Sequence, residues 1–137
     1  MTPEAILEAV RESMRGNLCE TLGMEIIRAE MGQLQARMPV DHRTRQPFGL
    51  LHGGASVALA ETLGSIGANM LAGPDRFAVG MEINANHLRA VRDGYVTGTA
   101  TLIHNGRSSQ VWEIRICDEQ GQLCCISRFT AALRDRS

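Results

Sequence analysis

The sequence has few aromatic residues, almost no excess charge and no secretory leader pattern. Aromatic side chains make up only 4% of the 137 residues, so aliphatic and alanine side chains must build most of the core. The net charge of −1 argues against a nucleic-acid partner, because such proteins neutralise many phosphates. The first residues, Met1-Thr-Pro-Glu-Ala-Ile, contain neither a basic region nor an apolar run, so no secretory signal is expected.

The cysteines lack the spacing of a metal site. Cys19, Cys117, Cys124 and Cys125 form no CxxC pair and have no nearby histidine at a metal-binding distance in sequence. The chain is long enough to bury a core of its own, so it does not need a disulfide framework. We therefore expect reduced thiols, no metal and a cytoplasmic location.

Residues 52–73 form the longest stretch with almost no charge. Its length approaches that of a membrane span, but it holds Glu61, Asn69 and several glycines, so we expect no membrane insertion. Glu61 is the only charged side chain between His52 and Gly73. Surface helices usually carry several charges and buried helices carry none, because burying an unpaired carboxylate is costly. The isolated carboxylate predicts a group held for chemistry; the alternative is a solvated helix face.

The periodicity of apolar residues predicts an α+β fold with one domain over residues 1–137. Thr2-Pro3-Glu4 is typical of a helix start and predicts a helix at about 3–15, and a longer helix is expected at about 53–71. Alternating apolar and polar residues predict strands at about 24–29, 34–40, 77–90, 95–104, 109–118 and 122–133. One long helix flanked by antiparallel hairpins favours a single curved sheet wrapped around that helix.

The two faces of the long helix differ in side-chain size. A helical projection places one apolar stripe toward the sheet, formed by Leu59, Leu63, Ile66 and Met70. The opposite side is expected to carry the small residues around Glu61, namely Gly54, Ala58, Gly64, Ser65, Gly67 and Ala68. Glycine inside a helix costs about 1 kcal/mol relative to alanine. These glycines therefore predict that a ligand or a second subunit approaches the helix closely.

His52-Gly53-Gly54 lies where a loop enters the long helix. Backbone N–H groups in the first helical turn have no intrahelical partner, and the helix dipole adds partial positive charge there. An oxygen that develops negative charge is stabilised at such a place, and Gly53 would let a carbonyl come close to its N–H. Taken alone, the same pattern is also typical of structural loop-to-helix turns.

A longer pattern resembles the hot-dog fold thioesterases. Gln46-Pro-Phe-Gly-Leu-Leu-His-Gly-Gly-Ala-Ser is followed by Ala60-Glu-Thr-Leu-Gly-Ser65, and the likeness continues through Glu82-Ile-Asn-Ala-Asn-His87, Gln110-Val-Trp and Asp118-Glu-Gln-Gly-Gln-Leu-Cys-Cys125. It covers about residues 24–133. The resemblance is to the glutamate-helix branch that includes a 4-hydroxybenzoyl-CoA thioesterase, bacterial 1,4-dihydroxy-2-naphthoyl-CoA hydrolases and enterobactin proofreading thioesterases.

The resemblance implies roles for five residues. Glu61 matches the catalytic carboxylate, which either attacks the thioester carbonyl or activates a water, and the sequence leaves both open. Gly53 matches the residue whose backbone N–H polarises that carbonyl. Gln46 and His52 match a pair that helps to position the thioester and the catalytic groups. Ser65 matches a hydroxyl that can hold the hydrolytic water.

The resemblance also implies contacts with coenzyme A. The implied residues are Gly80, His87, Leu88, Arg89, Ala90, His104, Asn105, Gly106, Arg107, Ser108 and Ser109. Arg89, Arg92 and Arg107 offer positive charge for phosphates, whose exposed contacts are weak and salt-dependent. The alternative for His87 and Arg107 is that they are ordinary surface residues.

These observations predict a hydrolase that cleaves an aromatic or broad-range acyl-CoA without a cofactor. The resemblance implies a homotetramer, a dimer of dimers with active sites at subunit interfaces. One alternative is a proofreading thioesterase that acts on a misacylated aryl carrier protein, and another is a non-catalytic acyl-CoA-binding protein. A purely structural module would leave Glu61 and Gln46 unexplained.

Overall fold

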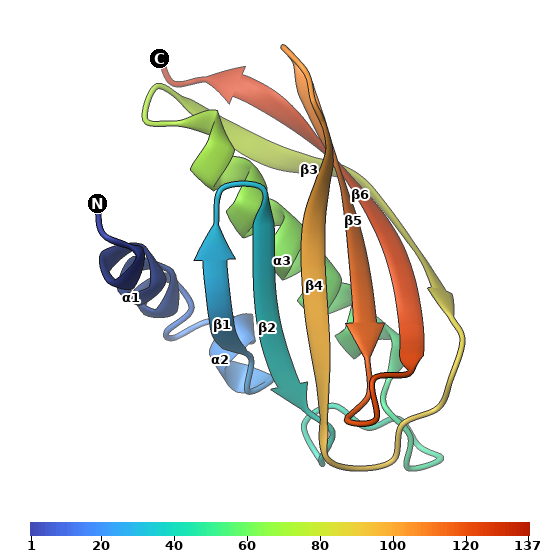
Figure 1. Cartoon of the computed structure of the whole chain (residues 1–137). Helices are drawn as coiled ribbons and strands as arrows, with labels where there is room; N and C mark the ends of the chain where they lie inside the picture. The colour runs from blue at the N-terminus through green and yellow to red at the C-terminus, as the bar shows by residue number, and fades with distance from the viewer.

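A long helix lies in the curve of one antiparallel sheet in the computed structural model, which describes residues 1–137 (Figure 1). In chain order the elements are α1 (Pro3–Ser13), α2 (Leu18–Thr21), β1 (Glu25–Glu30), β2 (Gln33–Pro39), α3 (Gly53–Ala72), β3 (Arg76–His87), β4 (Tyr95–Asn105), β5 (Ser109–Cys117) and β6 (Leu123–Asp135). The expected α+β arrangement is confirmed. No helix combines the length and the apolar character that crossing a bilayer requires.

The sheet has six strands in the order β1-β2-β4-β5-β6-β3. Every neighbouring pair is antiparallel. β3 follows α3 in the chain but pairs with the last strand, β6, so it forms one edge of the sheet while β1 forms the other. The outer edge of β3 therefore has no strand partner within the chain, and it runs alongside α3 (Figure 1).

The concave face of the sheet carries the core that α3 covers. Trp112, Ile114 and Ile116 on β5 alternate with more exposed residues and are fully buried, as the period-two pattern predicts. Trp112 needs a partner for its indole N–H, and the buried Gln110 amide oxygen accepts it at 2.9 Å. The same Gln110 amide donates to the Ala68 carbonyl of α3 at 3.3 Å, which ties the helix to the sheet.

Gly64 and Gly67 in the middle of α3 face the sheet, so the expected placement of Gly64, Gly67 and Ala68 on the opposite side is wrong. All three are buried. A Cβ at Gly64 would lie 2.5 Å from the Phe129 ring, and one at Gly67 would lie 2.6 Å from the Trp112 ring. The close approach is therefore made by the aromatic rings of the core and not by a ligand or a second subunit.

The reason for the error lies in what the sheet presents to the helix. Leu59 and Leu63 are fully buried as expected, but Ile66 and Met70 are only half-buried at the flank of the contact. The large rings on β5 and β6 leave space only for glycine beneath them, so the small residues mark the centre of the interface. A helical projection weighted by hydrophobicity assigns the sheet-facing side to the larger aliphatic side chains, and it therefore misplaces the centre of the interface.

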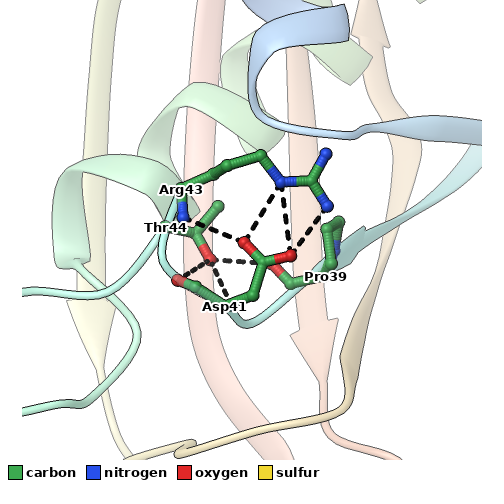
Figure 2. A network of polar contacts seen from close by, with 4 residues as sticks. All are labelled: Pro39, Asp41, Arg43 and Thr44. Atoms are coloured by element: carbon green, nitrogen blue, oxygen red, sulfur yellow. Dashed lines mark hydrogen bonds and ion pairs between the residues drawn. The ribbon is translucent and has the colours of Figure 1, made fainter.

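The loop between β2 and α3 is held by a polar network at its start (Figure 2). The Asp41 carboxylate accepts the Arg43 backbone N–H at 2.9 Å and its guanidinium at 2.7 Å. The buried Thr44 hydroxyl donates to the Pro39 carbonyl at 2.7 Å and accepts the Asp41 N–H at 3.1 Å. The Thr44 carbonyl then accepts the His52 N–H at 2.7 Å, so this network fixes the residue that precedes α3.

We expect Gly64→Ala to lower the free energy of unfolding by about 1–2 kcal/mol, because the added methyl overlaps the Phe129 ring. The gain in helix propensity, about 1 kcal/mol, offsets only part of this strain. Urea denaturation measures the change. The neighbouring Ser65→Ala, which adds no volume to the half-buried Ser65, should leave stability within about 0.5 kcal/mol of wild type. Equal or higher stability of Gly64→Ala would contradict the packing described here.

The Asp41 network should make stability depend on pH in the acid range. Its hydrogen bonds with Arg43 lower the pKa of Asp41 from 3.8 to about 2. A lowered carboxyl pKa stabilises the fold above the unfolded value of 3.8, and that contribution is lost as the pH falls through about 2. Urea unfolding between about pH 4 and pH 2 should therefore show a steeper loss for wild type than for Asp41→Asn. Asp75→Asn is the control, and parallel profiles for wild type and Asp41→Asn would refute the assignment.

Candidate active site

His52 caps the N-terminus of α3 with its own side chain. Its Nδ1 accepts the Gly54 N–H at 2.8 Å, and its carbonyl accepts the N–H groups of Ala55 and Ser56. An accepting Nδ1 carries no proton, so a neutral His52 ring holds its proton on Nε2, where it can be donated. The sequence placed His52 at the site but missed the cap, because histidine is not a usual N-cap residue.

The Gly53 N–H has no acceptor within the chain. It is the first N–H of α3 and therefore lies at the positive end of the helix dipole. The His87 ring, from the end of β3, lies directly over Gly53, where a Cβ would be 2.9 Å from Nε2. Any larger residue at this position would displace the imidazole, so glycine keeps the N–H and the ring side by side.

Gln46 presents its amide nitrogen to the same space. Its Oε1 accepts the N–H groups of Phe48 at 2.5 Å and Leu50 at 3.4 Å, so a tight turn fixes the oxygen. The amide nitrogen has no acceptor in the chain and remains free to donate. Its neighbours line one cavity of about 370 Å³, whose walls include Gln46, Gly53, His87, Leu88, Arg89 and Ala90. We call this cavity the donor half-site.

Glu61 projects from the exposed flank of α3, two turns after Gly53. Its carboxylate makes no hydrogen bond and no ion pair within the chain. It lines a second cavity of about 310 Å³ together with Ser65, one turn further along the same face. We call this cavity the carboxylate half-site. Glu61 and Ser65 thus face the same cavity, and the role of the Ser65 hydroxyl stays a prediction.

Sequence reasoning missed the N-terminal wall of the carboxylate half-site. Ser13 at the end of α1, Met14 directly after it and Cys19 in α2 close it opposite α3. The Cys19 thiol lies 3.9 Å from the Thr62 hydroxyl. No periodicity or motif predicts this contact, because it depends on how a short segment folds back over a helix more than forty residues later in the chain.

Gly80, expected along coenzyme A, lies against the Glu61 carboxylate of its own chain. A Cβ on Gly80 would be 2.9 Å from Glu61 Oε2 and 3.0 Å from the Phe129 ring. The pairing of β3 with β6 shifts register between Gly80 and Glu82, which marks a bulge at this position. The edge strand therefore bends where it passes the carboxylate.

Within one chain, the two half-sites lie too far apart to contact the same carbonyl group. Gly53 and Glu61 are eight residues apart, which is about 12 Å along a helix. A nucleophile and an oxyanion donor must each lie about 3 Å from atoms of the same carbonyl group. No residue lines both cavities. Each chain therefore presents two separate sets of candidate catalytic groups.

The two runs expected along coenzyme A are also separated. His104–Ser109 lies at the β4–β5 hairpin, where the Arg107 carbonyl accepts the Arg76 guanidinium at 2.6 Å. His87–Ala90 lies at the opposite end of β3, eleven residues from Arg76, or roughly 35 Å along a strand (Figure 1). Arg89 lines the donor half-site, whereas Arg92 lies in the loop that follows.

The cysteine beside the donor half-site is not a catalytic thiolate. Burial raises the pKa of the Cys124 thiol, and it does the same for Cys125. Both therefore stay protonated near neutral pH, and a protonated thiol is a weak nucleophile. No three His, Cys, Asp or Glu side chains gather as metal ligands. The free carboxylate of Glu61, which lines the carboxylate half-site, is the candidate nucleophile or base.

Comparison with known proteins agrees with this geometry. The family model described as the thioesterase superfamily matches residues 48–125, more than half of the chain. The proofreading thioesterase EntH of Cronobacter turicensis is 53% identical over 127 residues, which cover 93% of each chain. The 1,4-dihydroxy-2-naphthoyl-CoA hydrolase of Escherichia coli is 48% identical over 127 residues, again 93% of each chain.

Solved structures show the same fold. A thioesterase from Haemophilus influenzae superposes with a TM-score of 0.91 at 48% identity, covering 94% of this chain and 90% of that one. A mutant thioesterase from Pseudomonas aeruginosa gives a TM-score of 0.92 at 44% identity, covering 95% and 94%. The family match includes Gly53, Glu61 and Ser65, which the structure places at the two half-sites. The chain therefore belongs to the thioesterase superfamily, with its hot-dog fold, and is an enzyme that hydrolyses thioesters.

Proposed function

We propose that this enzyme hydrolyses aromatic acyl-CoA thioesters, with Gly53 as the electrophilic contact and Glu61 as the nucleophile or general base. One observation carries the proposal. The chain holds a free backbone N–H at a helix start and a free carboxylate beside a hydroxyl, each facing its own cavity. Hydrolysis of a thioester needs both kinds of group, a donor for the carbonyl oxygen and a nucleophile or base, and no other reactive group.

The donor half-site would bind the carbonyl oxygen. The Gly53 N–H and the free amide nitrogen of Gln46 are two donors, and the helix dipole adds positive potential at the first of them. His52 would keep the first turn of α3 in place through its cap on Gly54. These groups would stabilise the oxygen as negative charge develops on it during attack.

The carboxylate half-site would supply the attack. By direct attack, Glu61 forms an anhydride with the acyl group, coenzyme A leaves as a thiolate that takes up a proton, and water then cleaves the anhydride. By general-base catalysis, Glu61 removes a proton from a water held by Ser65, and that water attacks the carbonyl; the C–S bond then breaks, and coenzyme A leaves as a thiolate that takes up the proton from Glu61. A single turnover in ¹⁸O-water separates the two paths, because direct attack can pass unlabelled Glu61 oxygen to the product.

An aromatic acyl group fits the lining of the carboxylate half-site. Met14 and Ile66 provide apolar contact, and Ser65, Thr62 and Cys19 provide hydroxyl and thiol groups. A hydroxylated ring would find both kinds of contact there. Relatives named as a 1,4-dihydroxy-2-naphthoyl-CoA hydrolase and a proofreading thioesterase, at 48% and 53% identity, support this substrate class.

A thioester carried by an acyl or aryl carrier protein is the second candidate substrate. Leu88 lines the donor half-site and is 57% exposed. Phe48, whose backbone N–H donates to Gln46 Oε1, is 83% exposed. Exposed apolar residues beside a cavity suit contact with another protein. Coenzyme A itself would contact the arginines and the backbone of residues 87–90 and 104–109, together with Gly80. Because these two runs lie at opposite ends of β3, a single coenzyme A would reach them only as parts of two different chains.

We also propose that residues 1–137 act as one hot-dog domain in a cytoplasmic homotetramer, a dimer of dimers. The 12 Å between Gly53 and Glu61, estimated as about 1.5 Å per residue, supports a site shared between chains. The outer edge of β3 has no strand partner, and it exposes Val79 and Met81. A second copy along this edge would bring the donor half-site of one chain toward the carboxylate half-site of the other.

We expect Glu61→Ala to lower kcat by about 10²–10⁴-fold, the usual contribution of a catalytic acid or base, while coenzyme A binding persists. Thiol release from benzoyl-CoA and naphthoyl-CoA measures turnover, and calorimetry with free coenzyme A measures binding. Glu12→Ala, an exposed carboxylate on α1, is the matched control and should retain full activity. Undiminished hydrolysis by a folded Glu61→Ala protein would refute the role given to Glu61.

A shared site predicts that two inactive variants restore activity in mixed oligomers. Glu61→Ala keeps the donor half-site, and Gln46→Ala keeps the carboxylate half-site. In mixed dimers one of the two sites is intact, so random pairing should recover about a quarter of the wild-type sites. Co-expression with two affinity tags, followed by an activity assay, checks this. No recovery, or a fully active monomer in size-exclusion chromatography, would show that the site lies within one chain.

A further inference from the structure

Asn69 links α3 to the open edge of β3 through both ends of its amide. Oδ1 accepts the Ala78 N–H at 2.9 Å, and Nδ2 donates to the Ala78 carbonyl at 3.4 Å and to the Ser65 carbonyl at 2.9 Å. These partners fix the orientation of the amide, because turning it over would face donor to donor and acceptor to acceptor. The Asn69 side chain thus takes the place of a neighbouring strand at Ala78.

The backbone groups of Ala78 point away from the sheet. β3 pairs only with β6, where Leu133 is the residue opposite Ala78. Leu133 sends its own N–H in the other direction, to the Ser108 carbonyl at 2.9 Å. In an antiparallel pair, the backbone N–H and C=O groups of successive residues alternate: one residue bonds to the neighbouring strand, and the next directs its groups to the other side. Without Asn69, the Ala78 N–H and carbonyl would have no partner within the chain.

The link lies close to the Glu61 carboxylate. Glu61, Ser65 and Asn69 follow one another at four-residue spacing and share one face of α3. On β3, Ala78 is followed two residues later by Gly80, on the same face of the strand. Gly80 is the residue whose Cβ would lie 2.9 Å from Glu61 Oε2. Two turns of helix, about 12 Å, therefore separate Asn69 from Glu61, and two residues of strand separate Ala78 from Gly80.

Glu61 has no polar partner of its own to hold it. Its carboxylate lies against Gly80, where a Cβ would be 2.9 Å from Oε2. Between α3 and β3, the only side-chain hydrogen bonds are those of Asn69. The bulge between Gly80 and Glu82 interrupts the regular pairing of β3 with β6 at this point. The Asn69 amide is therefore the one side-chain hydrogen-bond link that holds the edge strand to α3.

We propose that Asn69 is a positioning residue for Glu61: its amide holds the edge of β3 against α3, so that Gly80 confines the carboxylate. This inference rests on the function proposed above. Asn69 touches neither the thioester nor the reacting atoms, and it acts through the backbone of Ala78 and Gly80. Small shifts of a catalytic group are costly, and a displacement of about 1 Å can reduce turnover about 10²-fold.

The test compares Asn69→Leu and Asn69→Asp with a matched control, Gln35→Leu. Gln35 also makes an amide hydrogen bond between elements, to the Thr99 hydroxyl at 3.1 Å, but on strands away from Glu61. We expect Asn69→Leu to lower kcat about tenfold or more with less than about a threefold change in KM. Asn69→Asp, which keeps an acceptor for the Ala78 N–H and loses the donor, should fall between. Gln35→Leu should leave both constants unchanged.

A double-mutant cycle separates positioning from general destabilisation. If Asn69 acts through Glu61, then adding Asn69→Leu to Glu61→Ala should lower the residual rate by less than about twofold. An equal loss in both backgrounds, or an unchanged kcat in Asn69→Leu alone, would overturn the proposal. Equal rates for wild type and Glu61→Ala would instead refute the proposed function, and the positioning role with it.

Amide hydrogen exchange provides a readout that does not depend on activity. The Ala78 N–H should exchange slowly in wild type and in Gln35→Leu, and at least about tenfold faster in Asn69→Leu, while the core amides of β5 keep their protection. Slow exchange at Ala78 in Asn69→Leu would show that something other than the amide holds the strand edge, and it would overturn the proposal even if kcat had fallen.

Discussion

The depth at which α3 packs into the sheet depends on the Phe129 ring. On one side the ring lies under Gly64, where a Cβ would be 2.5 Å away, and on another it borders Gly80, where a Cβ would be 3.0 Å away. A single aromatic side chain thereby determines both how close the helix comes and where the edge strand passes. The Glu61 carboxylate lies against Gly80, one of the two residues that border this ring, so core packing and the surroundings of Glu61 share one constraint.

The other end of the helix depends on backbone groups. The buried Thr44 hydroxyl and carbonyl hold the loop that delivers His52, and His52 then satisfies Gly54 while the Gly53 N–H remains unpaired. A free donor at a helix start is stable only where water or a ligand reaches it. One chain thus presents the Gly53 N–H in one cavity and the Glu61 carboxylate in another, and neither cavity contains both groups.

The sequence predicted the parts of the fold that follow from local pattern. Strand alternation around Trp112 and the helix that begins at Gly53 were visible because burial has a period that residue order records. The faces of α3 were assigned wrongly because the partners of Gly64 and Gly67 come from strands forty-five or more residues later. Glu61 was predictable because its isolation is itself a local signal.

What remained hidden in the sequence are contacts made by ordinary residues in particular places. Cys19 approaches Thr62 only because segments 43 residues apart fold together, and Asn69 reaches Ala78 across the turn that joins α3 to β3. Neither residue type marks its role. The Asn69 contact also has a consequence for sheet growth. An exposed strand edge can accept any other strand, but at Ala78 the amide already occupies both backbone groups. If another strand pairs with the outer edge of β3, its backbone hydrogen bonds must therefore end before Ala78. The Asn69 side chain thus limits how far such a strand can pair along β3.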